Sequence, residues 1–190
     1  MSYLSDSYGT WRGWVRHQLA IVEFFMGRVD GWVTLRHPAN VRRLVFVCLG
    51  NINRSVFAEF VARSQGLKTC SLGLATSHGS AAFHKAIVTA KPMGFDLESH
   101  RSTPFDNYTA AEGDLLLVME IRHAHALIRK GVPSDRIALL GAWSRPVRFH
   151  LHDPHTLSDD YFRSCFGLIQ SAVLNLADEL RAAQSPCANP

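Results

Sequence analysis

The stretch Leu44-Val45-Phe46-Val47-Cys48-Leu49-Gly50-Asn51-Ile52-Asn53-Arg54-Ser55 joins an apolar run to a short polar loop and the start of a second apolar pattern. Residues 44–47 are β-branched, aromatic or aliphatic and predict a buried strand, whereas residues 55–62 have the spacing of a helix. A loop that ends at a helix N-terminus presents backbone N–H groups and the positive end of the helix dipole, which attract anions. The stretch therefore predicts an anion-binding loop with Cys48 at one end and Arg54 at the other.

The residue types in this loop indicate phosphate chemistry. Five residues separate Cys48 from Arg54, so one loop can hold a nucleophilic sulfur beneath an oxyanion. A helix N-terminus and a nearby cation favour the thiolate, which is the reactive form of cysteine. The planar Arg54 guanidinium suits two phosphate oxygens, Gly50 permits close backbone approach and Asn51 tolerates a positive φ. The predicted phosphate-binding residues are Leu49, Gly50, Asn51, Ile52, Asn53, Arg54 and Ser55.

These residues resemble the signature of the low-molecular-weight protein tyrosine phosphatases, V-C-x-G-N-x-C-R-S, over residues 47–55. Asp153-Pro154 resembles the pair that carries the general acid in this family. Weaker matches follow in the family's order: Ser71-Leu72-Gly73, Gly94-Phe95-Asp96-Leu97, His100-Arg101-Ser102 and Val118-Met119-Glu120. The resemblance extends from about Arg42 to about Leu180. It implies hydrolysis of phosphotyrosine through a cysteinyl phosphate on Cys48, with Asp153 as general acid and then base and with neither metal nor cofactor.

The resemblance also implies supporting roles. Ser55 would donate a hydrogen bond to the sulfur as it leaves, and His100 resembles the family histidine that supports the loop asparagine, here Asn51. Leu49 and His155 are predicted to line the substrate cleft, where aromatic residues are common in the family and where a histidine ring can stack on a phenol.

Two residues in the loop and its helix depart from the family pattern. Asn53 stands where many members carry a second cysteine, so the reversible disulfide that protects the nucleophile from oxidation is not expected here. Val56 replaces a proline that is helpful but not essential in a first helical turn. Neither change removes a group that the chemistry requires.

Other functions are weighed against this one. An arsenate reductase on the same scaffold needs two further cysteines in a flexible segment, and no cysteine lies between Cys70 and Cys165. A non-catalytic phosphate-binding or interaction protein is a second alternative, which Asn53 and His155 leave open. The cluster His150, His152, Asp153 and His155 has donors that suit zinc. Because Asp153 has a better assigned role as the acid, we expect no metal.

The chain outside the loop predicts an α/β fold. Strands are expected at 44–48, 68–72, 115–119 and 136–140, and helices at 55–65, 80–91, 122–130 and 159–183, with Ser158 as an N-cap. Alternation of strands and helices predicts an open, twisted, mainly parallel four-stranded sheet flanked by helices. The expected domain covers residues 42–183, followed by a tail at 184–190. Its Cys48 loop would lie at a strand's carboxyl end, where such sheets bind ligands.

Residues 1–41 lie outside the resemblance and predict an additional amphipathic helix. Its apolar residues recur at helical spacing: Trp11, Trp14, Val15, Leu19, Val22, Phe25, Met26 and Val29. Glu23 interrupts the apolar stretch, so a signal peptide is not expected. Three roles are open to this helix: burial against its own domain, contact with a second copy of the chain in a homodimer, and docking on a membrane surface.

Composition agrees with one α/β domain in the cytoplasm. The chain has 190 residues, of which 47% are hydrophobic, and this suffices for a single core. The net charge of +4 does not demand a nucleic-acid partner. Cys48, Cys70, Cys165 and Cys187 have no zinc or disulfide spacing and are expected to be reduced thiols. The expected partner is a phosphotyrosine protein and, by analogy with bacterial members of the family, a tyrosine kinase.

Overall fold

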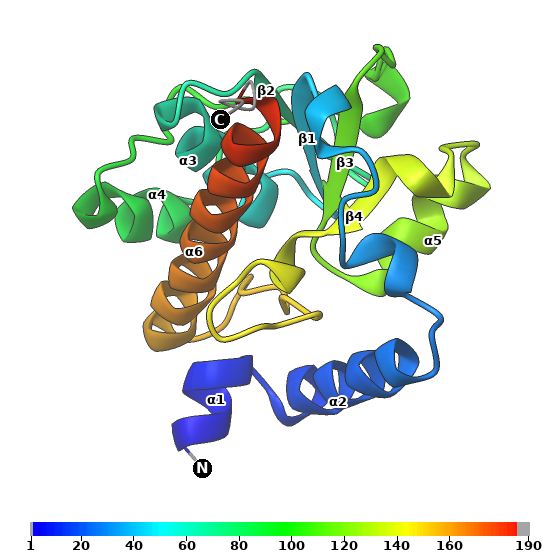
Figure 1. Cartoon of the computed structure of the whole chain (residues 1–190). Helices are drawn as coiled ribbons and strands as arrows, with labels where there is room; N and C mark the ends of the chain where they lie inside the picture. The colour runs from blue at the N-terminus through cyan, green and yellow to red at the C-terminus, as the bar shows by residue number, and fades with distance from the viewer. Residues whose placement is uncertain (1, 186–190) are drawn as a thin grey trace.

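A four-stranded parallel sheet forms the centre of the computed structural model, which describes residues 2–185 (Figure 1). Its strands are β1 (Arg43–Cys48), β2 (Thr69–Gly73), β3 (Asp114–Val118) and β4 (Ile137–Leu139), in the order β2-β1-β3-β4. Val45 of β1 lies opposite Cys70 of β2 and Leu116 of β3. The predicted strands agree with these bounds to within one residue, and the predicted parallel sheet is confirmed.

Helices cover both faces of the sheet. On one face α3 (Arg54–Ser64), α4 (His84–Ala90) and α6 (Asp159–Gln184) share the larger apolar core, in which the rings of Phe57 and Phe166 stack 4.1 Å apart. On the other face α5 (Ile121–Arg129) packs over the smaller core. Short 3₁₀ helices occur at 30–32, 38–40, 91–93, 105–107, 134–136 and 140–142.

One predicted helix begins later than expected. The helix predicted at 80–91 starts at His84, because residues 80–82 pair with another loop. Ala81 forms an antiparallel bridge with Arg101, and the Ser80 amide donates to the Ser102 hydroxyl at 3.0 Å. The predicted N-cap of α6 is confirmed, since the Ser158 hydroxyl accepts from the Tyr161 amide at 3.2 Å.

The N-terminal extension (residues 2–41 of the described chain) contains two helices, α1 (Ser2–Tyr8) and α2 (Trp11–Phe25). The predicted amphipathic helix is therefore present, but it ends at Phe25, and Val29 is buried in the smaller core instead. The face of α2 toward the domain carries small or polar buried residues, Gly13, His17 and Ala20. Its large apolar side chains point outward, with Trp11 65% and Phe25 81% exposed. Within residues 2–185, no helix has both the length and the apolarity to cross a membrane.

Candidate active site

The Cys48 loop crosses the carboxyl edge of the sheet, between β1 and α3. The Asn51 amide lies 3.3 Å from the Cys48 sulfur, and the Ser55 hydroxyl oxygen lies 3.1 Å from it. The side-chain amide of Asn51 donates to the Ser55 oxygen at 2.9 Å. Because that oxygen already accepts a bond, the Ser55 hydroxyl proton is free to point at the sulfur. The loop thus directs the Asn51 amide and the Ser55 hydroxyl at the Cys48 sulfur.

Asn51 holds the loop in shape. It has a positive φ of 51°, a conformation that asparagine adopts more readily than most residues. Its side chain donates to the Ser71 hydroxyl at 2.8 Å and accepts from the Thr103 amide at 2.8 Å. Its backbone carbonyl lies 2.8 Å from His100 Nε2. Burial lowers the pKa of His100, although the bond to Asn51 opposes that shift, so a neutral ring donates this bond.

The sequence analysis missed Glu59, which completes this network from α3. The Ser71 hydroxyl donates to the Glu59 carboxylate at 2.6 Å, so the chain of bonds runs from the helix through Ser71 to Asn51. The signal available beforehand was a carboxylate within the apolar run of residues 56–62. The remaining loop residues are packed close by: the Ile52 carbonyl accepts from the Phe83 amide at 3.0 Å, and Asn53 directly precedes the first turn of α3 with a buried side chain.

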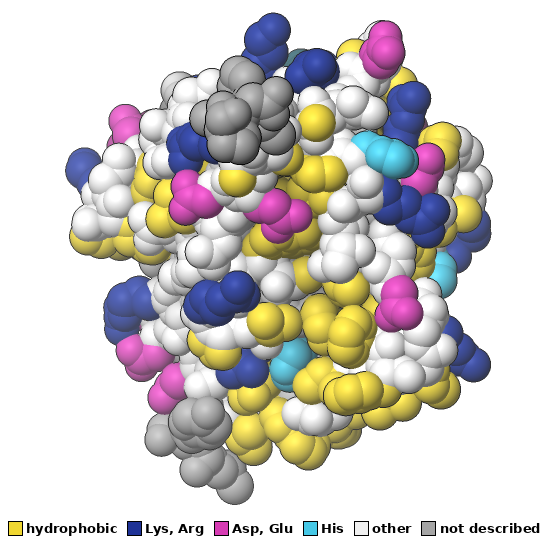
Figure 2. All heavy atoms as spheres, in the orientation of Figure 1, with side chains coloured by type: hydrophobic (Ala, Val, Ile, Leu, Met, Phe, Trp, Pro, Cys, Tyr) yellow, Lys and Arg dark blue, Asp and Glu magenta, His cyan; other side chains and the backbone are white. Residues whose placement is uncertain are grey.

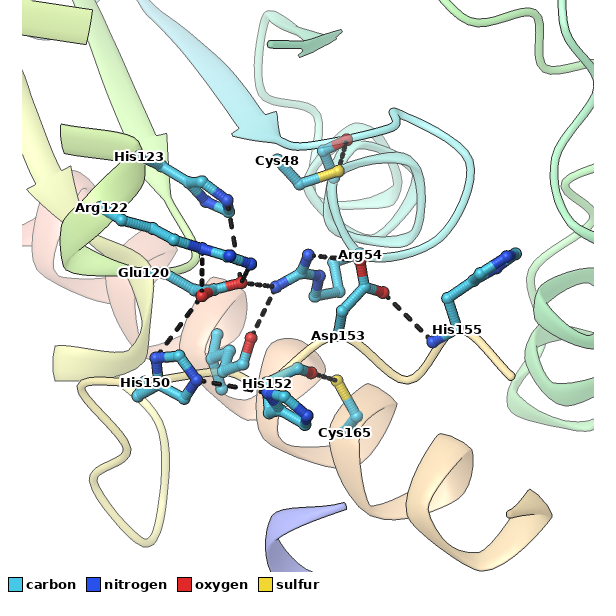
Figure 3. Close-up of polar contacts among 12 residues, drawn as sticks. Cys48, Arg54, Glu120, Arg122, His123, His150, His152, Asp153, His155 and Cys165 are labelled. Atoms are coloured by element: carbon cyan, nitrogen blue, oxygen red, sulfur yellow. Dashed lines mark hydrogen bonds and ion pairs between the residues drawn. The ribbon is translucent and has the colours of Figure 1, made fainter. Parts of the chain in front are cut away.

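Arg54 is fully buried at the start of α3 and is held by three acceptors (Figure 3). Its Nη1 donates to Glu120 at 2.6 Å and to the Leu151 carbonyl at 2.8 Å, and its Nη2 donates to Asp153 at 2.7 Å. Its Nε has no hydrogen-bond partner within residues 2–185. Burial would lower the pKa of Arg54, but the carboxylates of Asp153 and Glu120 outweigh burial and raise it. The guanidinium is therefore a fixed cation with a donor to spare.

Glu120 is the second residue that the sequence analysis did not assign, although its Val118-Met119-Glu120 match was noted. It follows β3 at the same sheet edge as the Cys48 loop, and its side chain is buried. Burial alone would raise the pKa of Glu120, yet the Arg54 cation outweighs burial and holds that pKa well below its usual range. Arg122 pairs with the same carboxylate at 2.7 Å from the exposed side. An ionised Glu120 orients Arg54.

Asp153 lies in residues 148–157, which we call the acid loop, before α6. One carboxylate oxygen accepts from Arg54, and the other accepts from the His155 amide at 3.2 Å. Its side chain is 29% exposed, so the carboxyl group borders both solvent and the Arg54 guanidinium. Cys48, Arg54 and Asp153, which sequence reasoning selected, thus come together at one edge of the sheet (Figure 3).

The two predicted cleft residues, Leu49 and His155, are both exposed, Leu49 by 41%. The His155 ring lies 4.6 Å from the Phe83 ring, which places an aromatic pair beside the acid loop. His155 points away from His150 and His152, whose rings face each other (Figure 3). In the described part of the chain, no three His, Cys, Asp or Glu side chains are arranged to hold a metal ion.

Comparison with known proteins places this geometry in context. Residues 43–185 match the family model described as low molecular weight phosphotyrosine protein phosphatase. The protein-tyrosine-phosphatase Wzb of Salmonella typhi is 30% identical over 75% of this chain and 96% of its own length. The crystal structure of the Erwinia amylovora tyrosine phosphatase AmsI superimposes with a TM-score of 0.66 at 27% identity, over 73% of this chain and 93% of that one. The arginine phosphatase YwlE of Geobacillus stearothermophilus shares the fold, with a TM-score of 0.65 at 23% identity over 75% of this chain and 95% of that one.

Proposed function

Since this chain belongs to the low molecular weight phosphotyrosine protein phosphatase family, we propose that Cys48 is the nucleophile, Arg54 the phosphate clamp and Asp153 the acid and base of a phosphotyrosine hydrolase. The chain is a phosphatase of the protein-tyrosine class, and the residue roles are our proposal. The observation that carries them is the convergence of donors on the Cys48 sulfur, with Arg54 and Asp153 paired at 2.7 Å beside the loop.

The reaction proceeds in two displacements. The Cys48 thiolate attacks phosphorus and forms an S–P bond as the P–O bond to the tyrosyl oxygen breaks, and Asp153 gives its proton to that oxygen. Water then attacks the thiophosphate while the Asp153 carboxylate takes the water proton. The S–P bond breaks, phosphate leaves, and the thiolate is stabilised by the Ser55 hydroxyl at 3.1 Å.

Arg54 serves both steps because its cation is fixed in place before substrate arrives. Glu120 and the Leu151 carbonyl hold Nη1, which leaves Nε and Nη2 toward the phosphate. Phosphate oxygens that bind Nη2 replace Asp153 there, and Asp153 is then released to carry the proton for the leaving group. Electrostatic stabilisation that is preorganised in this way is often the largest contribution to phosphoryl transfer.

We propose a phosphotyrosine protein as the substrate, with a bacterial tyrosine kinase as the candidate partner and the cytoplasm as the location. Reduced Cys48, Cys70 and Cys165 support a reducing compartment. The aromatic pair of His155 and Phe83 offers a surface on which a phenol ring can stack.

Wild-type protein should hydrolyse a phosphotyrosine peptide in the presence of a chelator, at least roughly tenfold faster in kcat/KM than matched phosphoserine and phosphoarginine peptides. The reason is that a phenol is a better leaving group than the serine alcohol, since its pKa is about 10, and that it can stack on His155. Phosphate release from the three peptides measures the preference. A preference for phosphoarginine would contradict the substrate, and no turnover of any peptide would favour a phosphate-binding protein without activity.

For the exposed apolar face of α2, we propose contact with an anionic membrane surface. This outer face comprises Trp11, Trp14, Leu19, Val22, Phe25 and Met26. Figure 2 shows hydrophobic side chains gathered along the lower edge of the molecule, where α2 lies in Figure 1. Residues 11–28 also carry three exposed cations, Arg12, Arg16 and Arg28, and one acid, Glu23. These cations favour anionic headgroups and would repel each other across a two-fold dimer axis.

The protein should sediment with vesicles that contain phosphatidylglycerol and much less with neutral phosphatidylcholine vesicles. The double variant Trp11→Ser/Phe25→Ser should bind at least about tenfold more weakly, because each side chain would otherwise bury apolar area in the interface. Val88→Ser on α4 is the matched control, since Val88 is 55% exposed on another helix. Absence of vesicle binding, with a dimer that the double variant dissociates in size-exclusion chromatography, would identify the outer face as a homodimer contact instead.

A further inference from the structure

The acid loop lies between the body of the domain and the N-terminal extension (Figure 1). The extension contacts the first residues of this loop, Arg148 and Phe149. The Arg148 guanidinium lies 4.2 Å from the centroid of the Tyr8 ring, and the Phe24 and Phe149 rings are 5.1 Å apart. From the domain side, the Tyr161 hydroxyl on α6 donates to the His152 carbonyl at 3.1 Å. The extension therefore covers the face of the acid loop that α6 does not hold.

Thr10 makes the contact nearest to Asp153. It is the N-cap of α2, where its hydroxyl oxygen accepts from the Gly13 amide at 3.0 Å. The same oxygen lies 3.3 Å from His152 Nε2, and His152 directly precedes Asp153. A Cβ on Gly13 would come within 3.0 Å of the His152 ring, so glycine lets the helix approach this closely. The start of α2 thus packs directly on the residue before the general acid.

From His152 a line of polar groups continues to the catalytic arginine (Figure 3). His152 Nδ1 lies 3.4 Å from His150 Nε2, and His150 Nδ1 lies 3.6 Å from the Glu120 carboxylate. Glu120 holds Arg54 at 2.6 Å, and Arg54 pairs with Asp153 at 2.7 Å. The line leaves the acid loop at His150 and returns to it at Asp153.

One placement of protons satisfies this whole line. Burial lowers the pKa of His150 to about 3 and also lowers the pKa of His152, so both rings are neutral and carry one proton each. Glu120 is ionised and can only accept, so the favourable tautomer of His150 has its proton on Nδ1, turned toward Glu120 at 3.6 Å, which is longer than a hydrogen bond, and Nε2 is left to accept. His152 then donates from Nδ1 and accepts at Nε2 from the Thr10 hydroxyl. Thr10 is the donor that completes the arrangement.

We propose that the N-terminal extension positions the general acid: Thr10 holds the His152 ring, and the line of rings to Glu120 keeps the acid loop docked over Arg54. This inference rests on the proposed role of Asp153. Thr10, His152 and His150 are positioning residues in it, because each acts through Asp153 or Arg54 and not on the phosphate. The extension lies outside residues 43–185, so this brace is added to the family's domain by a separate segment of the chain.

Leaving-group dependence tests the proposal, because a displaced acid matters only when the leaving oxygen needs a proton. Thr10→Val should lower kcat/KM for phenyl phosphate by about five- to twentyfold, a part of the roughly 10²- to 10⁴-fold that a general acid contributes. For 2,4-dinitrophenyl phosphate, whose phenolate leaves without a proton, the loss should stay below about twofold. Asp153→Asn should show the same selective loss of kcat/KM for phenyl phosphate, with the whole contribution of the general acid removed. Thr10→Ser should retain wild-type values because it keeps the hydroxyl.

Two controls separate positioning from folding. Thr10→Val also removes the N-cap of α2 and so lowers the stability of that helix. His152→Phe therefore provides a second variant, which leaves the cap intact and keeps a ring against Gly13. If both residues act through their mutual contact, the double variant should lose no more than the larger single loss. Thr34→Val is the matched control in the extension, since the exposed Thr34 hydroxyl bonds the Asp30 carbonyl within the extension itself.

The outcomes distinguish this inference from the proposed function. If the wild type is active but the variants lose the same factor for both aryl phosphates, the positioning role is contradicted and the proposed function is not. The same holds if Thr10→Val or His152→Phe shows no loss. No wild-type turnover of either compound would contradict the proposed function and the inference together. A selective loss with phenyl phosphate, rescued by serine at position 10, supports the brace.

Discussion

Replacing Cys48 with serine should lower the rate of phosphotyrosine hydrolysis by about 10⁴-fold or more. A serine hydroxyl would have to ionise to an alkoxide before it could attack phosphorus. The hydrogen-bond donors of the loop are not enough to ionise a serine hydroxyl at neutral pH. Stopped assays of phosphate release from an aryl phosphate, in reduced protein and with a chelator, measure this loss. Binding of inorganic phosphate should survive, because Arg54 and the backbone of the loop remain.

Cys70→Ser is the matched control for this change. Cys70 lies on β2, where burial is the main cause that raises the pKa of its thiol. Cys70 is therefore not a competing nucleophile. It should keep most of the wild-type activity, and unchanged thermal unfolding of Cys48→Ser should exclude loss of fold. If Cys48→Ser retained substantial turnover while Cys70→Ser lost it, the nucleophile would have been placed wrongly.

Replacing Arg54 with lysine should lower kcat/KM by roughly 10³- to 10⁵-fold, the range that an arginine contributes to phosphoryl transfer. Lysine keeps one positive charge beside Glu120, but it cannot hold Glu120 and two phosphate oxygens at once, because it lacks the planar fork. Measuring the affinity for inorganic phosphate beside kcat/KM shows how much of the loss in kcat/KM is due to weaker phosphate binding.

Two further variants show why lysine is the informative choice. Arg54→Met would leave the buried Glu120 carboxylate without its main partner, which costs about 3–5 kcal/mol of stability, so its lost activity would be ambiguous. Arg122→Lys is the matched control, since Arg122 pairs with the same carboxylate from a side chain that is 50% exposed. Its activity should change only a few-fold. An equal loss in Arg122→Lys and Arg54→Lys would argue against a phosphate clamp at Arg54.

Sequence reasoning anticipated the sheet and the Cys48 loop because both are local patterns. The apolar run before Cys48 and the helix after Arg54 lie within about a dozen residues of each other, so their spacing alone predicts strand, loop and helix. Asp153 was selected as the candidate acid through its resemblance to a family motif, because its contact with Arg54 cannot be read from the sequence. The start of the helix near residue 84 was misjudged, since residues 80–82 pair with the segment at 101–102, which local spacing cannot reveal.

The amino-acid sequence by itself determined the order of the elements and the place of the loop from Cys48 to Arg54 between a strand and a helix, since periodicity and short spacing are carried by neighbouring residues. Only the tertiary structure decided what surrounds them. Glu120 reaches Arg54 across 66 positions and Thr10 reaches His152 across 142, and each contact exists only because the sheet and α2 bring separate segments together. The outward turn of Trp11 and Phe25 has the same origin, since the small Gly13 and Ala20 allow α2 to pack closely by its opposite face.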